Sequence, residues 1–248
     1  MTCDTYVRGN YYTTIHLYVP PNTIGKDVIK RCYRTLYTLA LESHCTDAKF
    51  DILKPSHFHI SLSKGVNLRY HFIDPFLAVV SSIVAKFRSF PVILDTKAIN
   101  IYANDRKSRY FIGIGVANVS AKSKIQQLLD QLDLAIEQFG FSKYKGIPHV
   151  SLISTNNDIS PALNNRYPGH NALLWPDIDL NLSDSVINED QIDKLVSDSL
   201  SKISEDEIQE DCTQFDNCIV DYDTEITSFN ATSVVVTVGA RTNRIYFK

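Results

Sequence analysis

The sequence predicts an α+β protein made of antiparallel strands and a few long helices. Three observations lead to this prediction. Short aromatic and β-branched runs end at turn residues, as strands do. Apolar residues at helical spacing lie between these runs. The same order of strands and helices occurs in both halves of the chain, which predicts two similar lobes within one domain spanning residues 1–248.

The first half is expected to contain two strands and two helices. Residues 11–19 form an aromatic and β-branched run that Pro20 and Pro21 close, and residues 58–63 alternate between polar and apolar side chains. Apolar residues recur at helical spacing over residues 24–41 and again over residues 75–87. The second helix begins with Pro75, a residue that the first helical turn accepts readily.

The second half is expected to repeat this pattern. Residues 90–102 and 110–116 are predicted strands, joined by a polar turn at residues 104–108. Ser120 is predicted to cap a helix that ends at Gly140. A short strand at residues 149–153 follows. The chain closes with a hairpin of residues 233–238 and 244–247 around a turn at residues 239–243.

Charge is distributed unevenly along the chain. Residues 177–225 contain 16 acidic and two basic residues, whereas the rest of the chain contains 12 acidic and 23 basic residues. We expect the acidic stretch to be a flexible insertion, with a short helix within residues 188–203. The basic remainder indicates a polyanionic partner, with nucleic acid as the first candidate and a merely solvated basic surface as the alternative.

The cysteines and the apolar segments bear on location. Five widely spread cysteines without a C-x-x-C pair indicate free thiols in a reducing compartment, not disulfides or a zinc site. No run reaches 18 apolar residues, and the residues after Met1 lack the apolar core of a signal peptide. We therefore expect a protein of the cytosol or nucleus that has no membrane partner. A monomer is expected because nothing in the sequence resembles a long dimerisation seam.

A four-residue motif occurs once in each half. His59-Ile60-Ser61-Leu62 and His149-Val150-Ser151-Leu152 both read His, apolar, Ser, apolar, and 90 positions separate the two histidines. Because strand residues i and i+2 point to the same face, each histidine is expected beside its serine while the apolar residues turn into the core. If the halves pack with approximate two-fold symmetry, the two pairs face each other across a groove.

This arrangement suits the cleavage of a phosphodiester in RNA. Imidazoles titrate near neutral pH, so one can take the proton of a ribose 2′-OH while the other donates a proton to the departing 5′-oxygen. The hydroxyls of Ser61 and Ser151 can hold the non-bridging phosphate oxygens. The product is a 2′,3′-cyclic phosphate, and the reaction needs no metal or other cofactor. The motifs leave open which histidine is the base.

The other histidines lack this context. His57 is the nearest rival of His59, because it precedes it by two residues, but it has no counterpart in the second half. A zinc site is a weaker alternative, since the usual H-E-x-x-H and Cys/His spacings are absent. Surface or packing roles are expected for the remaining histidines: His16, His44, His71 and His170.

The paired motifs resemble the two-histidine (2H) phosphoesterase superfamily. Further segments are similar to the U6 snRNA 3′-end-processing phosphodiesterase family, in its fungal form. They read GNYYTT, FHISLS, LRYHFIDPF and IYANDRKSRYFIG, at residues 9–14, 58–63, 68–76 and 101–113. The closing strand pair also matches. The resemblance covers residues 9–154 and 229–248 and leaves the acidic stretch outside.

The resemblance implies a two-lobed fold with pseudo-two-fold symmetry and a central groove. It implies a metal-independent 3′→5′ exonuclease that trims uridines, and some adenosines, from U6 snRNA or another uridine-tailed RNA. A nuclear location follows from that substrate, and a mitochondrial pool would be compatible. Trimming leaves a cyclic phosphate, which fungal members open further to a 3′-phosphate.

Roles for individual residues also come with the resemblance. His59 and His149 are the implied catalytic pair. Tyr144 corresponds to a tyrosine that stacks on the terminal base, and the turn containing Asp105 borders the same pocket. The implied phosphate- and substrate-binding residues are Ser61, Ser151, Tyr144, Asp105 and Pro148.

Two other functions stay open at the level of the sequence. A 2H cyclic phosphodiesterase acting on small nucleotides would use the same histidines, but it would not need so basic a body. A non-catalytic RNA-binding module would need the basic body, but not two intact His-x-Ser pairs. Turnover of a cyclic nucleotide and of a uridine-tailed RNA separates these functions.

Overall fold

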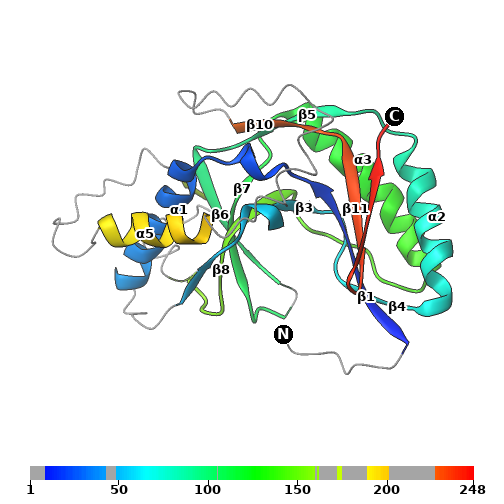
Figure 1. The fold of residues 1–248 in the computed structure, drawn as a ribbon, viewed down its shortest axis with the longest axis horizontal. Helices are drawn as coiled ribbons and strands as arrows, with labels where there is room; N and C mark the ends of the chain where they lie inside the picture. The colour runs from blue at the N-terminus through cyan, green and yellow to red at the C-terminus, as the bar shows by residue number, and fades with distance from the viewer. Residues whose placement is uncertain are drawn as a thin grey trace.

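A single antiparallel sheet of ten strands runs through both lobes and packs its apolar face against helices (Figure 1). The computed structural model describes residues 9–42, 49–104, 106–159, 161, 172–174, 189–200 and 227–248. The large sheet consists of β1 (Asn10–Tyr18), β2 (Phe50–Ile52), β3 (His59–Ser61), β4 (Val66–Arg69), β6 (Ala98–Ala103), β7 (Tyr110–Gly115), β8 (His149–Thr155), β9 (Ala172–Leu174), β11 (Ser233–Val238) and β12 (Arg241–Tyr246).

Helices and a small second sheet complete the described fold. The helices are α1 (Lys26–Glu42), α2 (Ile73–Val84), α3 (Val119–Gln138) and α5 (Glu189–Leu200), with short 3-10 turns η1 (Pro21–Thr23), η2 (Pro55–His57) and η3 (Tyr70–Phe72). Strands β5 (Phe90–Leu94) and β10 (Thr227–Ala231) pair with each other. In Figure 1, α1 and α5 lie beside β6–β8, whereas α2 and α3 lie beside β11 and β1.

The two lobes meet at the centre of the large sheet. Its strand order is β12-β11-β1-β3-β8-β7-β6-β9, with β4 pairing β1 and β2 pairing β8 beside this path. The first lobe contributes β3 and the second contributes β8, and Ile60 pairs with Val150 where they join. The central strands therefore carry one motif from each half, and the order of strands outward from them is similar on both sides.

Alternation along the strands separates a core face from a polar face. On β1, Ile15 and Leu17 are buried and His16 is only partly so; Ile60 and Val150 are fully buried on the central strands. Apolar side chains of α1, α2 and α3 join these residues in one core cluster. Burying the core face of every central strand in this way determines which face the intervening polar residues occupy.

Several predicted elements are confirmed, and others are corrected. The helices expected at residues 24–41, 75–87 and 120–139 are α1, α2 and α3. The predicted strand at residues 90–102 is wrong as a single element: it divides into β5 and β6, which belong to different sheets. The Asp95 carboxylate accepts the Lys97 N–H at the break. Strands β2, β4, β9 and β10 were not among the predicted elements.

The caps and turns also differ in detail from the predictions. Helix α3 begins at Val119 with Asn118 at its N-cap, not Ser120. The Asn118 side chain bonds the main chain of Ile93 and Pro91, so it ties the helix start to β5. The final hairpin is tighter than predicted, because Val238 already pairs with Arg241.

Part of the acidic stretch is visible. Helix α5 confirms the helix expected within residues 188–203, and Lys30 on α1 pairs with its Asp193 at 2.8 Å. The rest of that stretch lies outside the described residues, and so do all cysteines except Cys32, a buried free thiol. Among the described residues, no helix has the length and apolar character required to cross a membrane.

Candidate active site

The two His-x-Ser motifs lie side by side on the polar face of the sheet. Strands β3 and β8 are antiparallel and place Ile60 opposite Val150. The same register places His59 opposite Ser151 and Ser61 opposite His149. Because Ile60 and Val150 point into the core and are fully buried, the histidines and serines share the other face. The structure thus brings all four side chains together.

Each histidine is held by a main-chain carbonyl two residues earlier. His59 Nδ1 lies 2.6 Å from the carbonyl oxygen of His57, and His149 Nδ1 lies 2.7 Å from that of Ile147. A carbonyl oxygen can only accept, so Nδ1–H is the donor in both contacts. The neutral rings therefore carry their proton on Nδ1, which leaves the Nε2 lone pair available to accept a proton.

The two imidazoles resist simultaneous protonation. Burial lowers the pKa of His59, although the His57 carbonyl acts in the opposite direction. Burial, opposed by the Ile147 carbonyl and aided by the charge of His59, lowers the pKa of His149 to about 4. The two rings are therefore electrostatically coupled. This coupling favours states in which at most one of the two is a positively charged imidazolium.

His16 also lies at this site, where sequence reasoning expected only a surface or packing residue. Strand β1 places it opposite Ser61, and its ring centroid lies 4.9 Å from that of His59. Burial, and then the charge of His59, lower the pKa of His16 to about 4, so its ring is neutral at neutral pH. Alternation along β1 was the signal that could have located it, once β1 was known to neighbour β3.

Tyr102 is the second residue that the sequence did not single out. Its ring stacks on His149, with centroids 3.5 Å apart and planes 8° from parallel. It extends from β6 across β7, where Gly113 and Gly115 lie opposite the second motif. A Cβ at Gly113 would overlap the carbonyl oxygen of Val150, whereas a Cβ at Gly115 would meet the Tyr102 hydroxyl at 3.9 Å.

Tyr144 approaches the site from the segment that precedes β8. Its ring is partly buried and folds over Gly146, and its N–H donates to the Asp133 carboxylate of α3 at 2.9 Å. The pKa of Tyr102 is raised to about 12, first by burial and then by Tyr144 and Asp95, so Tyr144 lies within electrostatic range of Tyr102.

The remaining residues that the sequence analysis named are only partly placed at the site by the structure. Pro148 directly precedes His149 and is partly exposed. Asp105 lies outside the described residues. His57 is placed in η2 and touches the site through its carbonyl. The hydroxyls of Ser61 and Ser151 make no hydrogen bond within the described part of the chain, and no group of three or more His, Cys, Asp or Glu side chains there is arranged to hold a metal ion.

Two lobes that each contribute one His-x-Ser strand to the centre of a sheet define the two-histidine phosphoesterase fold. The structure of Kluyveromyces marxianus Usb1 has this fold and is similar to the chain, with a TM-score of 0.51 and 12% identity over 96% of this chain and 98% of that one. Residues 5–246 match the HVSL family model, described as an uncharacterised conserved protein. The chain belongs to this family.

Curated relatives agree with the resemblance seen in the sequence. U6 snRNA phosphodiesterase 1 of Mus musculus is 31% identical over 155 residues, which cover 62% of this chain and 53% of the mouse protein. The protein of the same name from Dictyostelium discoideum is 32% identical over 159 residues, which cover 62% of this chain and 54% of that protein. The chain spans about half the length of the curated relatives it matches.

Proposed function

We propose that the chain is an RNA phosphodiesterase that shortens the 3′ end of U6 snRNA, or of another uridine-tailed RNA, in the 3′→5′ direction. The observation that carries this proposal is the pair of imidazoles that share a sheet face with two serine hydroxyls. Each ring is anchored through Nδ1, which leaves its Nε2 lone pair available to exchange a proton. The names of the curated relatives support the choice of RNA. This substrate supports a nuclear location for the activity.

The first chemical step uses both imidazoles. One neutral ring accepts at Nε2 the proton of the penultimate ribose 2′-OH, and the 2′-oxygen forms a bond to phosphorus. The bond from phosphorus to the 5′-oxygen of the terminal nucleoside breaks, and the other ring, protonated, donates its Nε2 proton to that oxygen. The RNA keeps a 2′,3′-cyclic phosphate, and the terminal nucleoside leaves.

The serine hydroxyls supply charge stabilisation in this step. Each histidine lies across the strand pair from the serine of the other motif, so Ser61 and Ser151 flank the position of a phosphate held between the rings. Opening of the cyclic phosphate would use the same groups in exchanged roles, because water then replaces the 5′-oxygen. These residues provide proton transfer and charge stabilisation without a metal.

The terminal base belongs on the His149 side of the site. Tyr102 covers one face of His149, and Tyr144 lies within electrostatic range of Tyr102. We propose that Tyr144 stacks on the terminal base, with Pro148 and Asp105 contributing to the same pocket. The surplus of basic residues outside residues 177–225 attracts the phosphates of the remaining strand, so binding should weaken as salt is added.

An incubation in EDTA tests this function directly. The substrate is a short RNA that ends in several uridines with a free 2′,3′-diol, and mass spectrometry reads product length and end group. We expect stepwise loss from the 3′ end and products that end in a cyclic phosphate or a 3′-phosphate. His59→Ala and His149→Ala should retain RNA binding and lose trimming.

Other outcomes point to the alternative functions. An untouched RNA combined with hydrolysis of a 2′,3′-cyclic mononucleotide would identify a small-nucleotide phosphodiesterase. RNA binding without a change of length or end group would identify a binding module. Normal trimming by either histidine variant would show that the catalytic assignment is wrong.

A further inference from the structure

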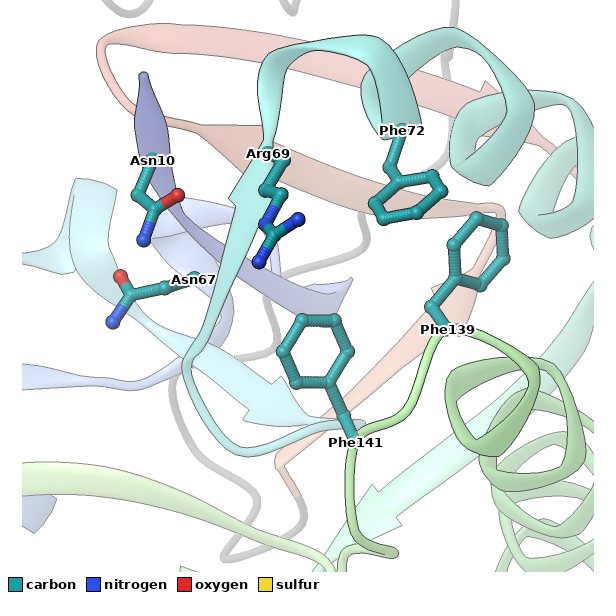
Figure 2. A pocket seen from close by; sticks show the side chains of 6 residues that line it. All are labelled: Asn10, Asn67, Arg69, Phe72, Phe139 and Phe141. Atoms are coloured by element: carbon teal, nitrogen blue, oxygen red, sulfur yellow. The ribbon is translucent and has the colours of Figure 1, made fainter. Parts of the chain in front are cut away.

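A half-open hollow of about 380 Å³ lies away from the catalytic histidines, and the proposed reaction makes no use of it. The start of β1, strand β4, the turn η3 and the end of α3 form its walls (Figure 2). We call it the Arg69 hollow. The residues that line it are Asn10, Asn67, Arg69, Phe72, Phe139 and Phe141.

The lining combines one cation, two amides and three aromatic rings. In Figure 2, Arg69 points between the two asparagines on one side and the phenylalanines on the other. Arg69 is exposed, and its side chain has no hydrogen bond or ion pair with any other residue that the structure describes. No acidic residue is among the lining residues, and Glu137 nearby pairs with Lys143 at 3.2 Å. The guanidinium is therefore available to an anion.

The aromatic wall is held in place by the core. Phe139 contacts the buried Phe76 edge to face, with ring centroids 5.2 Å apart. Phe72 contacts Phe139 in the same way, with centroids 5.8 Å apart. Phe72 remains 37% exposed, with the His71 ring as a further neighbour at a centroid distance of 4.3 Å. Phe141 is tied down by its N–H, which donates to the Ile136 carbonyl at 3.2 Å. A ring that is already ordered loses little entropy when a base stacks on it.

The Arg69 hollow and the catalytic residues occupy the same face of the sheet. Strand β1 pairs Asn10 with Arg69 and Tyr12 with Asn67, and farther along it pairs His16 with Ser61. Directly opposite residues of an antiparallel pair share a face, and even-numbered residues of β1 share one as well. At about 3.3 Å per residue, Asn10 lies roughly 20 Å from His16 along the strand.

Aromatic and cationic groups bridge this distance. Tyr12 is 57% exposed on the shared face and lies over Gly65, where a Cβ would overlap its ring. Lys64, in the same turn, donates a hydrogen bond to Ser142 in the segment that leads from the Arg69 hollow toward His149. An exposed ring and a cation between two sites on one face are the groups that surfaces binding single-stranded nucleic acid use without reading its sequence.

We propose that the Arg69 hollow binds a nucleotide of the RNA strand being trimmed, several positions on the 5′ side of the cleaved bond. Arg69 pairs with a phosphate, a base stacks on Phe72 or Phe141, and the asparagine amides bond base or ribose edges. The inference rests on the proposed function. The terminal nucleoside occupies the Tyr102 and Tyr144 side, so the rest of the strand leaves on the β1 side, toward the hollow.

The volume and chemistry of the hollow favour RNA over a protein partner. A volume of about 380 Å³ is at the lower end of the range of roughly 300–1,000 Å³ for small-molecule sites, which suits one nucleotide unit. A guanidinium flanked by amides and rings matches a phosphate, a ribose and a base together. Because the hollow and the histidines occupy the same face of the sheet, one RNA strand can contact both.

Trimming of RNAs of two lengths tests the proposal. The substrates are a uridine dinucleotide, too short to reach the Arg69 hollow, and an oligouridine of about ten nucleotides. We expect Arg69→Gln to lower the ratio of kcat/KM for the long RNA to kcat/KM for the dinucleotide by about 10-fold, and Phe72→Ala to do likewise. Arg88→Gln is the matched control, since it removes one exposed arginine beyond the C-terminal end of α2.

Binding provides a second measurement that does not depend on turnover. An oligouridine whose penultimate ribose lacks the 2′-OH cannot be cleaved, so its Kd can be measured for the wild type and for each variant at several salt concentrations. Arg69→Gln should raise this Kd about 10-fold relative to Arg88→Gln and should reduce its salt dependence. Melting curves confirm that the variants are folded.

The outcomes separate this inference from the proposed function. If the wild type trims both RNAs and Arg69→Gln behaves as Arg88→Gln in both assays, the hollow does not bind RNA while the proposed function stands. If the wild type trims neither RNA, the proposed function fails, and the binding assay still decides the role of the hollow. Equal Kd values for the two arginine variants would overturn the proposal in either case.

Discussion

The ring of Tyr102 lies flat against the imidazole of His149, with centroids 3.5 Å apart. The other imidazole of the pair, His59, instead has His16 as its neighbour, at 4.9 Å and with the planes tilted by 51°. The repeat that relates the two halves therefore covers the motifs but not the side chains around them. This asymmetry gives the two histidines different environments.

Removing the Tyr102 ring should raise the pKa of His149. Burial is the largest cause that lowers this pKa to about 4, so Tyr102→Ala should move it toward 6.5. Tyr102→Phe keeps the stacked ring and should change the pKa much less. Titration of the imidazole by NMR measures both variants. An unchanged pKa in Tyr102→Ala would show that the stack is not what buries His149.

His16 should support catalysis without exchanging a proton. Its neutral ring contacts His59, so His16→Gln is expected to lower kcat by about 10-fold, whereas His59→Gln should cost roughly 10²–10⁴-fold. His57→Gln should cost far less than His59→Gln, because His57 contacts the site through its main chain. Single-turnover trimming rates provide the comparison. A loss in His57→Gln as large as that in His59→Gln would reassign the catalytic residue.

The activity of the free enzyme should have an acidic optimum. The active pair consists of one neutral imidazole and one imidazolium. Burial lowers the pKa of both His59 and His149 below the ordinary value of 6.5. At a pH below both values the base is lost, and at a pH above both the acid is lost. We therefore expect the maximum of kcat/KM below pH 6.5. A bound phosphate favours imidazolium, so the maximum of kcat should lie at a higher pH.

The measurement is trimming of a uridine-tailed RNA from about pH 4 to about pH 9, with kcat and kcat/KM fitted separately. A kcat/KM maximum clearly above pH 7 would contradict the expected environment of the histidines. Loss of one limb of the pH profile in a histidine variant would assign that limb to the histidine that was replaced.

Stability should fall when the pH drops below 6.5. His16 and His149 have pKa values of about 4 in the folded chain and of 6.5 as the ordinary value, so the unfolded state binds more protons between these limits. The free energy of unfolding therefore rises with pH through this window. The stabilising contribution of the two histidines is complete above it. At about 1.4 kcal/mol per pKa unit, each histidine contributes up to about 3 kcal/mol.

Urea unfolding at about pH 7 and about pH 4.5 measures this dependence. Carboxylates also titrate in acid, so the comparison is between the wild type and His16→Gln, which lacks one of the two histidines. The variant should lose less stability between the two pH values. An identical loss would show that His16 does not resist protonation in the folded chain.

Gly113 should be intolerant of a side chain. A Cβ there would overlap the Val150 carbonyl at the irregular register between β7 and β8, so Gly113→Ala should destabilise the chain by about 1–3 kcal/mol. Gly115→Ala is the matched control for stability, because its Cβ would meet the Tyr102 hydroxyl at an ordinary contact distance. Thermal unfolding compares the two. Equal melting temperatures would mean that the strands adjust without strain.

Elements with a long and regular pattern could be predicted from the sequence. The apolar spacing within α2 and α3 and the β-branched run of β11 correspond closely to the observed bounds. The break between β5 and β6 falls at the polar residues Asp95, Thr96 and Lys97, which the predicted strand ran through, and the pairing of β5 with β10 places the two in different sheets. The short strands β2 and β4 contain too few residues to show a period.

The same division applies to the site. Alternation within a strand is local, so the sequence by itself determined that each histidine shares a face with its serine and that the apolar residues between them enter the core. Only the tertiary structure decided that Ile60 pairs with Val150 and that His16 and Tyr102 are the neighbours of the two histidines. Register and strand order depend on packing between residues far apart in the chain, and a local period does not contain that information.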